Sequence, residues 1–347
     1  MSNRLPHFHS ILELYHSLVD SFETVLVAPR IRRSYPLTDY LVSLYRDILE
    51  NNDDHSSIRI RDLSPIGHFR MIYYALISKK TVILHYHWFE FQGVKQLLAL
   101  PYKLLCISIF RKFNTRIVWT IHNLEPHDRK YLHLHKKLHA WMACKADLLH
   151  LHSPTLLGSS AHYLEIDPES SKWAVLKHPE FPAKPIPKAD AVHALNEMYN
   201  LQLPTDEIIL LLFGNISEYK GIDSFITLSK PYSSQFHVLI AGPVKIGQNH
   251  THQNILKAIG SYTDRFHYVP RFIDEEHYAY LLSSADYCVF NYTNIHSSGG
   301  AAMALSYKKR IIAPKIGIFN DLENEAESFL YSSSKELESI IRTIGAS

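Results

Sequence analysis

The segment that decides the fold of this chain is Leu210-Leu-Leu-Phe-Gly-Asn-Ile-Ser-Glu-Tyr-Lys-Gly-Ile-Asp-Ser-Phe225. An apolar run ends at Gly214, a short polar loop follows, and Lys220-Gly221 opens a predicted helix. A buried parallel strand that leads into a helix N-terminus is where α/β proteins bind ligands, because backbone N–H groups are unpaired there. The lysine adds a positive charge. The segment therefore predicts an anion site, with a diphosphate as the first candidate.

Strands and helices alternate along the whole chain, which predicts doubly wound parallel sheets. The predicted strands of the first half are Thr24–Pro29, Ser57–Leu63, Thr81–His87, Arg116–His122 and Ala146–His152, and its predicted helices are Asp39–Asn51, Val94–Phe110 and Tyr131–Cys144. The predicted strands of the second half are Ile208–Phe213, Phe236–Ala241, Arg265–Val269, Tyr287–Asn291 and Arg310–Ala313.

The length of 347 residues predicts two domains, because single cores stop growing at about 250–300 residues. Four prolines fall within Lys177–Lys188, which neither a helix nor a central strand tolerates. We therefore expect an N-terminal domain at 1–180, a linker region at 181–206 and a C-terminal domain at 207–330. We expect a C-terminal helix at 331–347, with a return to the N-terminal domain as one option.

Composition narrows the class of protein. Net charge is +2, which argues against bulk nucleic-acid binding, although the chain through Glu180 carries +5 and the remainder −3. That asymmetry suits either an anionic partner such as a membrane surface or an ordinary solvated surface. The three cysteines lie far apart with no CxxC spacing, as expected of a reducing cytoplasm without disulfides or a zinc site. No secretion signal, no membrane-spanning run and no GxGxxG after the first strand is found, and the last point argues against a dinucleotide dehydrogenase.

Four segments, in order, resemble those of GT-B glycosyltransferases of the bacterial polysaccharide-building kind, including mannosyltransferase-like relatives. The segments are His85–Glu90, Val118–Asp128, Phe213–Gly221 and Tyr292–Ala302. The resemblance implies two Rossmann-like doubly wound parallel-sheet domains facing a cleft. It also implies that the second domain binds a nucleotide-sugar donor and the first binds an acceptor.

The expected diphosphate site combines the two C-terminal segments. Ser297-Ser298-Gly299-Gly300 opens a helix, whose unpaired N–H groups and dipole favour an anion. The residues expected to bind the diphosphate are Gly214, Asn215, Lys220, Ser297, Ser298 and Gly299. Arg271 or Phe272 is expected to contact the nucleobase, and His296 the donor sugar.

Two departures from the resembling family bear on the mechanism. Many relatives have arginine where Asn215 stands, which removes one cation from the expected site. Relatives of the commonest retaining type carry a Glu-x7-Glu pattern, and His296 and Ser297 occupy that region here. We therefore expect an inverting reaction in preference to a retaining one.

Catalytic residues are expected at the strand ends of the first domain. His122 is a candidate general base or a donor to the sugar, and Glu125 and Asp128 are the carboxylate options for the base. His87, Trp88 and Glu90 are candidates for the acceptor side. Arg33, in an arginine-rich loop after the first strand, is a candidate contact for a phosphorylated lipid carrier. No metal and no cofactor is expected.

These observations predict a cytoplasmic glycosyltransferase, with association to the membrane as an option. It would move a hexosyl group to a glycan or polyprenyl-linked acceptor in surface polysaccharide biosynthesis. GDP-mannose is the first expected donor and a UDP-sugar the second. The alternatives are a catalytically inactive GT-B partner subunit, suggested by Asn215 and the missing glutamate pair, and a nucleotide-sugar epimerase.

Overall fold

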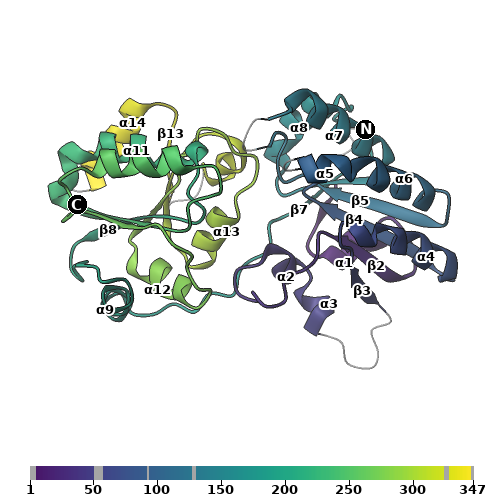
Figure 1. The fold of residues 1–347 in the computed structure, drawn as a ribbon, viewed down its shortest axis with the longest axis horizontal. Coiled ribbons are helices and arrows are strands. Elements are labelled where there is room, and N and C mark those ends of the chain that lie inside the picture. The colour runs from purple at the N-terminus through teal and green to yellow at the C-terminus, as the bar shows by residue number, and fades with distance from the viewer. Residues whose placement is uncertain (1–4, 51–57, 92–93, 127–129, 324–327, 345–347) are drawn as a thin grey trace. The chain divides into compact units, whose positions relative to one another are not determined.

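The computed structural model describes residues 5–50, 58–91, 94–126, 130–323 and 328–344. The chain forms two compact units, Met1–Pro179 and Glu180–Ser347. Each unit is built on one parallel sheet with helices packed against it (Figure 1). The prediction of two parallel α/β sheets is therefore confirmed.

Within these ranges the first unit has a seven-stranded sheet of order β1-β7-β6-β5-β4-β2-β3, with every pairing parallel. Its strands are β1 (His7–Phe8), β2 (Phe22–Ala28), β3 (Arg59–Asp62), β4 (Thr81–His87), β5 (Thr115–Thr120), β6 (Leu148–Leu151) and β7 (Trp173–Leu176). Its helices are α1 (Ile11–His16), α2 (Tyr40–Leu44), α3 (Arg46–Glu50), α4 (Phe69–Ile77), α5 (Val94–Leu98), α6 (Leu100–Phe110), α7 (Leu132–Lys145) and α8 (Leu157–Leu164), with short 3₁₀ turns η1 (Ile66–His68) and η2 (Pro154–Leu156). Every residue of β4 is buried, as expected of a strand covered on both faces.

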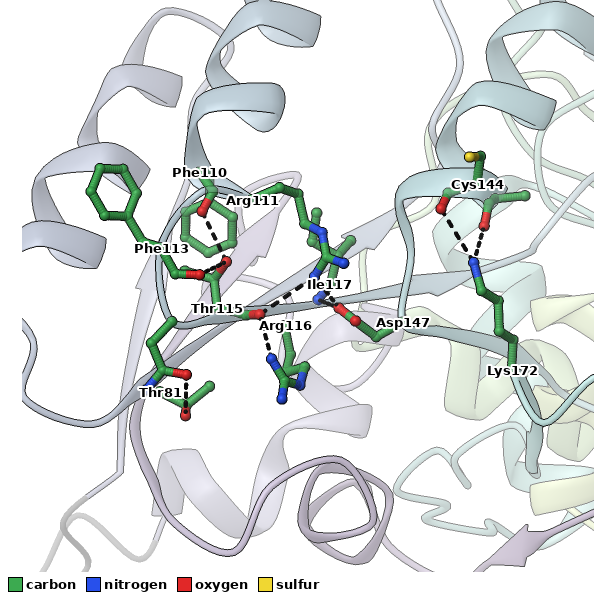
Figure 2. A network of polar contacts seen from close by, with 12 residues as sticks. Thr81, Phe110, Arg111, Phe113, Thr115, Arg116, Ile117, Cys144, Asp147 and Lys172 are labelled. Carbon is green, nitrogen blue, oxygen red and sulfur yellow. Dashed lines mark hydrogen bonds and ion pairs between the residues drawn. The ribbon is translucent and has the colours of Figure 1, made fainter.

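Polar contacts tie the helices to the sheet at the amino ends of the strands, as Figure 2 shows. Asp147 accepts hydrogen bonds from Arg111 at the end of α6 (2.7 Å) and from the backbone N–H of Ile117 in β5 (2.8 Å). The Thr115 hydroxyl donates to the carbonyl of Phe110, the last residue of α6 (2.9 Å). These contacts fix where α6 ends relative to β5.

Within the described residues the second unit has a six-stranded sheet of order β10-β9-β8-β11-β12-β13, again all parallel. Its strands are β8 (Ile208–Phe213), β9 (Phe236–Ala241), β10 (Phe266–Val269), β11 (Tyr287–Val289), β12 (Arg310–Pro314) and β13 (Ser328–Tyr331). Its helices are α9 (Lys188–Tyr199), α10 (Ile222–Ser229), α11 (Asn249–Ile259), α12 (His277–Ser284), α13 (Gly299–Ser306) and α14 (Ser334–Ile344), with 3₁₀ turns η3 (Glu218–Lys220), η4 (Lys230–Gln235) and η5 (Gly317–Leu322). Alternate residues of β8 enter two separate apolar clusters, one on each face of the sheet.

Several elements differ from the expectations. The stretch 181–206, expected as a linker, contains α9, whose Val192 and Leu195 are fully buried in the core of the second unit. Pro187 stands at the N-cap of α9, where proline is tolerated because the first turn needs no N–H donor. Helix α14 packs against α10 within the second unit. The expected helix Asp39–Asn51 is divided at Tyr45 into α2 and α3.

Candidate functional site

In each sheet, strand order reverses at one place, and ligands of open α/β sheets bind beyond the carboxyl ends of the strands there. In the second unit the reversal lies between β8 and β11. The loop after β8 carries Lys220, and the loop after β11 leads to Ser298. The two loops are bonded to each other, because Thr293 N–H donates to the Tyr219 carbonyl (2.8 Å). The two segments predicted to form the diphosphate site are therefore neighbours.

Lys220 is held at this edge by backbone geometry. Its ammonium group is buried and donates a hydrogen bond to the carbonyl of Phe213, the last residue of β8 (2.6 Å). Burial lowers the pKa of Lys220 to about 7. Gly214 has a φ of +83°, and a Cβ atom there would lie 3.1 Å from the lysine Nζ. The glycine therefore provides both the left-handed backbone and the space that the ammonium group needs.

A side-chain hydrogen bond from Asn291, which follows β11, fixes the start of α10. The Asn291 side-chain NH₂ donates to the Gly221 carbonyl (2.7 Å), and the Asn291 Oδ1 accepts from the Tyr331 hydroxyl (2.5 Å). Gly221 has a φ of +56°, and a Cβ atom there would meet the Asn291 carbonyl at 2.5 Å. No residue larger than glycine fits without movement of the backbone. Asn291 and Tyr331 were not among the predicted site residues, because only the folded sheet brings them to this loop.

Helix α13 presents its N-terminus at the same edge. Ser298 is its N-cap and accepts a hydrogen bond from Ala301 N–H (3.1 Å). Gly299 is exposed at the first turn, Ser297 is half-buried, and Gly300 lies close enough to the Phe290 ring that a Cβ atom would be 3.3 Å from it. The helix start can therefore approach the sheet closely and leave backbone N–H groups for an anion.

The remaining predicted donor residues have varied surroundings. His296 is buried, which lowers its pKa to about 4, so the ring is neutral near pH 7. Asn215 is exposed in the loop after β8. Arg271 donates to the Met198 carbonyl at the end of α9 (3.0 Å) and lies over the Tyr199 ring. Phe272 is 58% exposed. Arg271 and Phe272 follow β10, the edge strand, and are thus two strands away from Lys220 in the sheet.

In the first unit the strand order reverses between β2 and β4, and the predicted residues His87, Trp88 and His122 gather beside that edge. The His122 ring is 5% exposed and stacks on Trp88 with ring centroids 4.1 Å apart and planes 12° apart. His87 Nδ1 lies 3.3 Å from His122 Nε2. Tyr40, at the start of α2, meets the His122 ring edge-on at 4.7 Å. Tyr40 was not predicted.

Behind His122 lies a buried hydrogen-bond network that starts at one carbonyl. Leu176 O accepts from His150 Nε2 (2.9 Å) and His152 Nδ1 (3.2 Å), so both nitrogens carry protons. Burial lowers the pKa of His150 to about 4, which leaves its Nδ1 as an acceptor. The Thr120 hydroxyl lies 2.7 Å from that nitrogen and therefore donates to it. His152 Nε2 is then a buried lone pair with no hydrogen-bond partner among the described residues.

The network continues from Thr120 to His122 in two alternative proton arrangements. Because the Thr120 proton is used, His85 Nε2 must donate to Thr120 (2.7 Å), and His85 Nδ1 accepts. That acceptor lies 2.7 Å from the Tyr15 hydroxyl and 2.8 Å from the Tyr45 hydroxyl.

If Tyr15 donates to His85, Tyr45 can donate to His87 Nε2 (3.1 Å), and the proton between His87 and His122 then belongs to His87. If Tyr45 donates to His85, His87 Nε2 donates back to Tyr45. For neutral rings, the proton between His87 and His122 then belongs to His122. The two arrangements place the His122 proton on different ring nitrogens. His85 and His87 were readable as a pair from sequence, since residues i and i+2 of a strand share one face.

The contacts of the carboxylate candidates Glu90 and Glu125 differ from those of the histidines. Glu90 accepts a hydrogen bond from Asn123 (3.4 Å). Burial raises the pKa of Tyr163 in α8 to about 12, with a smaller contribution from Glu125 and then from Glu90. Asp128 lies outside the described residues. Within the part of the chain that the structure describes, no group of three or more metal-ligating side chains is arranged to hold an ion.

Arg33 is paired with Asp62 (3.0 Å) and lines a cavity of about 480 Å³. The other lining residues are Ile48, Leu49, Ile58, Arg59, Ile60 and Arg61. The predicted acceptor-side arginine therefore belongs to a basic hollow beside the edge strand β3. His87, Trp88 and Glu90 belong instead to the loop end of β4.

The fold, with its two parallel sheets, is that of the GT-B glycosyltransferases. Sucrose-phosphate synthase from Thermosynechococcus elongatus matches with a TM-score of 0.65 and 18% identity, over 93% of this chain and 89% of that one. HepE from Anabaena, in complex with UDP and glucose, matches with a TM-score of 0.63 and 13% identity over the same shares. The catalytic domain of starch synthase IV from Arabidopsis thaliana, bound to ADP and acarbose, matches with a TM-score of 0.60 and 12% identity, over 92% and 91%.

At these identities the likeness establishes the fold. No protein-family model matches the chain, and none of the curated proteins searched matches its sequence.

Proposed function

We propose that this chain is a glycosyltransferase that moves a hexosyl group from a nucleotide sugar to a hydroxyl of a glycan or lipid-linked acceptor. The observation that carries the proposal is that buried Lys220 and the N-terminus of α13 follow the two strands at the reversal point of the second sheet, in loops bonded to each other through Thr293 and Tyr219. A cation and free backbone N–H groups suit a diphosphate. The GT-B neighbours solved with nucleotides support the same class of reaction.

In the proposed reaction the acceptor oxygen attacks the anomeric carbon, and the bond from that carbon to the diphosphate oxygen breaks. The nucleoside diphosphate leaves with the electron pair, and Lys220, Ser297, Ser298 and the Gly299 N–H stabilise it without a metal. His122 or Glu125 takes the acceptor proton. Inversion is preferred, because the Glu-x7-Glu pattern of retaining relatives is missing.

The donor is either GDP-mannose, which the sequence resemblance favours, or a UDP-sugar. Solved neighbours in complex with UDP, UDP and glucose, or UDP-glucose support the second option. We place the reaction in the cytoplasm, in surface polysaccharide biosynthesis. A lipid-linked acceptor would be met at a membrane surface, and peripheral membrane contact is part of the proposal.

The test is incubation of the protein with GDP-mannose, UDP-glucose and other nucleotide sugars, with and without glycan and polyprenyl-linked acceptors. Release of the nucleoside diphosphate only in the presence of an acceptor is the expected result. Isomerisation of the donor without an acceptor would show an epimerase, and binding without either reaction would show an inactive subunit. If neither UDP nor GDP gives heat on titration, the diphosphate site itself is refuted.

A further inference from the structure

Helix α4 and the 3₁₀ turn η1 before it expose a stripe of apolar side chains to solvent. Ile66, Phe69, Tyr73 and Leu76 are each between 55% and 83% exposed. Their spacing of three and four residues places them on one face of a helix. In α4 only Met71 is buried among the described residues. The stripe therefore faces away from the core of its unit.

A second apolar stripe lies on the adjoining helices. Leu98 of α5 and Tyr102 and Leu105 of α6 are 76%, 36% and 59% exposed. The opposite side of α6 is also apolar, because Cys106, Ile107 and Phe110 are buried. A helix that is apolar all round is normally covered on all sides. The outward side of α6 therefore lacks the cover that its composition predicts.

The two stripes form one surface. The Tyr102 hydroxyl donates to the Ile66 carbonyl (2.7 Å) and accepts from the Phe69 N–H (3.0 Å), and α4 packs against α6. The contacts of Arg111 and Thr115 hold the far end of α6 in place (Figure 2). We name this the α4–α6 surface, and it consists of Ile66, Phe69, Tyr73, Leu76, Ile77, Leu98, Tyr102 and Leu105. Contiguous apolar surfaces of this kind mark binding sites.

Charge identifies the partner. The segments 64–80 and 94–113, which contain these helices, have seven Lys and Arg residues and no Asp or Glu. Arg70, Lys79, Lys80 and Lys112 are exposed. A second copy of this chain docked face to face would bring like charges together, which is unfavourable. An anionic bilayer offers negative headgroups for the cations and acyl chains for the apolar side chains.

We propose that the α4–α6 surface docks on an anionic lipid bilayer. The helices lie in the headgroup region, with their apolar side chains directed into the acyl boundary and the lysines at the phosphates. No helix among the described residues is long and apolar enough to cross a membrane, so the contact is peripheral. The proposal deepens the proposed function by naming the surface that would meet a lipid-linked acceptor, and it is carried by different residues from the diphosphate site.

The experiment is co-sedimentation of the full chain with phosphatidylcholine vesicles that contain or lack phosphatidylglycerol. We expect binding to the anionic vesicles, weakened by salt. The triple variant Phe69→Ser/Leu76→Ser/Leu105→Ser and the triple variant Lys79→Glu/Lys80→Glu/Lys112→Glu should each lower the partition coefficient by about tenfold or more. The matched control is Ile246→Ser/Leu256→Ser, which removes exposed apolar side chains from the second unit and should change nothing.

Circular dichroism melting checks that each variant keeps its fold, and the charge variant changes only surface side chains. Absence of binding to anionic vesicles, or binding that neither triple variant reduces, would overturn the proposal. So would a dimer, seen by size-exclusion chromatography, that the serine variant dissociates while vesicles are not bound. The assay contains no nucleotide sugar and no acceptor. Its failure is therefore distinct from a failure of the proposed transfer reaction.

Discussion

The two sheets carry their candidate sites at equivalent places and build them from different chemistry. In the second unit the site consists of backbone groups and one buried cation, Lys220. The contact of Lys220 is local, because it donates to the carbonyl of Phe213, a residue close to it in sequence. In the first unit it consists of histidine and tyrosine side chains from separate strands and helices. Tyr15 and His85, which are 70 residues apart, are one example.

The difference indicates two tasks. A fixed cation and helix N–H groups stabilise a charge that appears on a leaving diphosphate. Burial instead lowers the pKa of His85, His87 and His152 well below the ordinary value of histidine, so this network is neutral at pH 7. A neutral network attracts no anion, and its two proton arrangements place the His122 proton on one ring nitrogen or the other. The edge of the first sheet that carries its candidate site (the first edge) is therefore suited to a hydroxyl and its proton. The corresponding edge of the second sheet (the second edge) is suited to a phosphate.

The largest expected effect comes from His122→Ala, which should lower kcat by about 10²–10⁴-fold if His122 is the general base. Affinity for the nucleoside diphosphate should stay unchanged, because that site belongs to the other sheet. Steady-state kinetics and calorimetric titration measure the two quantities. Glu125→Gln is the matched comparison and should retain most of the activity. The opposite ranking would assign the base to Glu125 and leave the histidine network a structural role.

Lys220→Ala should weaken nucleoside diphosphate binding by about 1.5–3 kcal/mol, the range for a charge-assisted hydrogen bond. Calorimetric titration with UDP and GDP measures it. Lys335→Ala, which removes an exposed lysine at the start of α14, is the control and should leave affinity unchanged. An unchanged affinity in Lys220→Ala would remove the central difference between the two edges.

The second edge could be predicted from sequence because its information is local. Ile208–Phe213 and Phe236–Ala241 were predicted as strands with the bounds that they have, and the strand, loop and helix order around Lys220 follows from consecutive residues. Of the first edge, His87, Trp88 and His122 were predicted. Tyr40 and Tyr45 were not predicted, because they reach this edge only through tertiary packing. Helix α4 was not predicted, although the spacing of Phe69, Tyr73 and Leu76 fits one face of a helix.

Thr120→Val tests whether the first edge is a single network. The change leaves the His85 and His150 nitrogens without the hydroxyl that joins them, and an unsatisfied buried polar group costs about 1–3 kcal/mol. Urea unfolding at neutral pH should show that loss, and the pH profile of kcat should shift. Thr120→Ser keeps the hydroxyl and should restore both measurements. Equal stability of the valine and serine variants would show that the network is not coupled.

The pH dependence of binding should differ between wild type and Lys220→Ala. Burial lowers the pKa of Lys220 to about 7, and a bound diphosphate favours the protonated form, so binding above pH 7 takes up a proton. Affinity should be full below pH 7 and fall by up to about tenfold per pH unit above it, until the pKa of the complex is reached. Titrations in buffers of different ionisation enthalpy measure the uptake. A flat profile in the wild type would contradict a lysine at this edge whose pKa lies near 7.

Gly214→Ala is the smallest and most local test of how the second edge is built. Gly214 has a φ of +83°, and an added Cβ would lie 3.1 Å from the Lys220 ammonium, so alanine strains the backbone and crowds the cation. We expect a loss of about 1 kcal/mol in the free energy of unfolding and weaker diphosphate binding. Gly158→Ala in α8 is the matched control. Its Cβ would meet nothing within 4 Å, and helix propensity predicts a gain of about 0.5–1 kcal/mol. If the two variants behaved alike, the loop after β8 would not be under the backbone constraint on which the position of Lys220 depends.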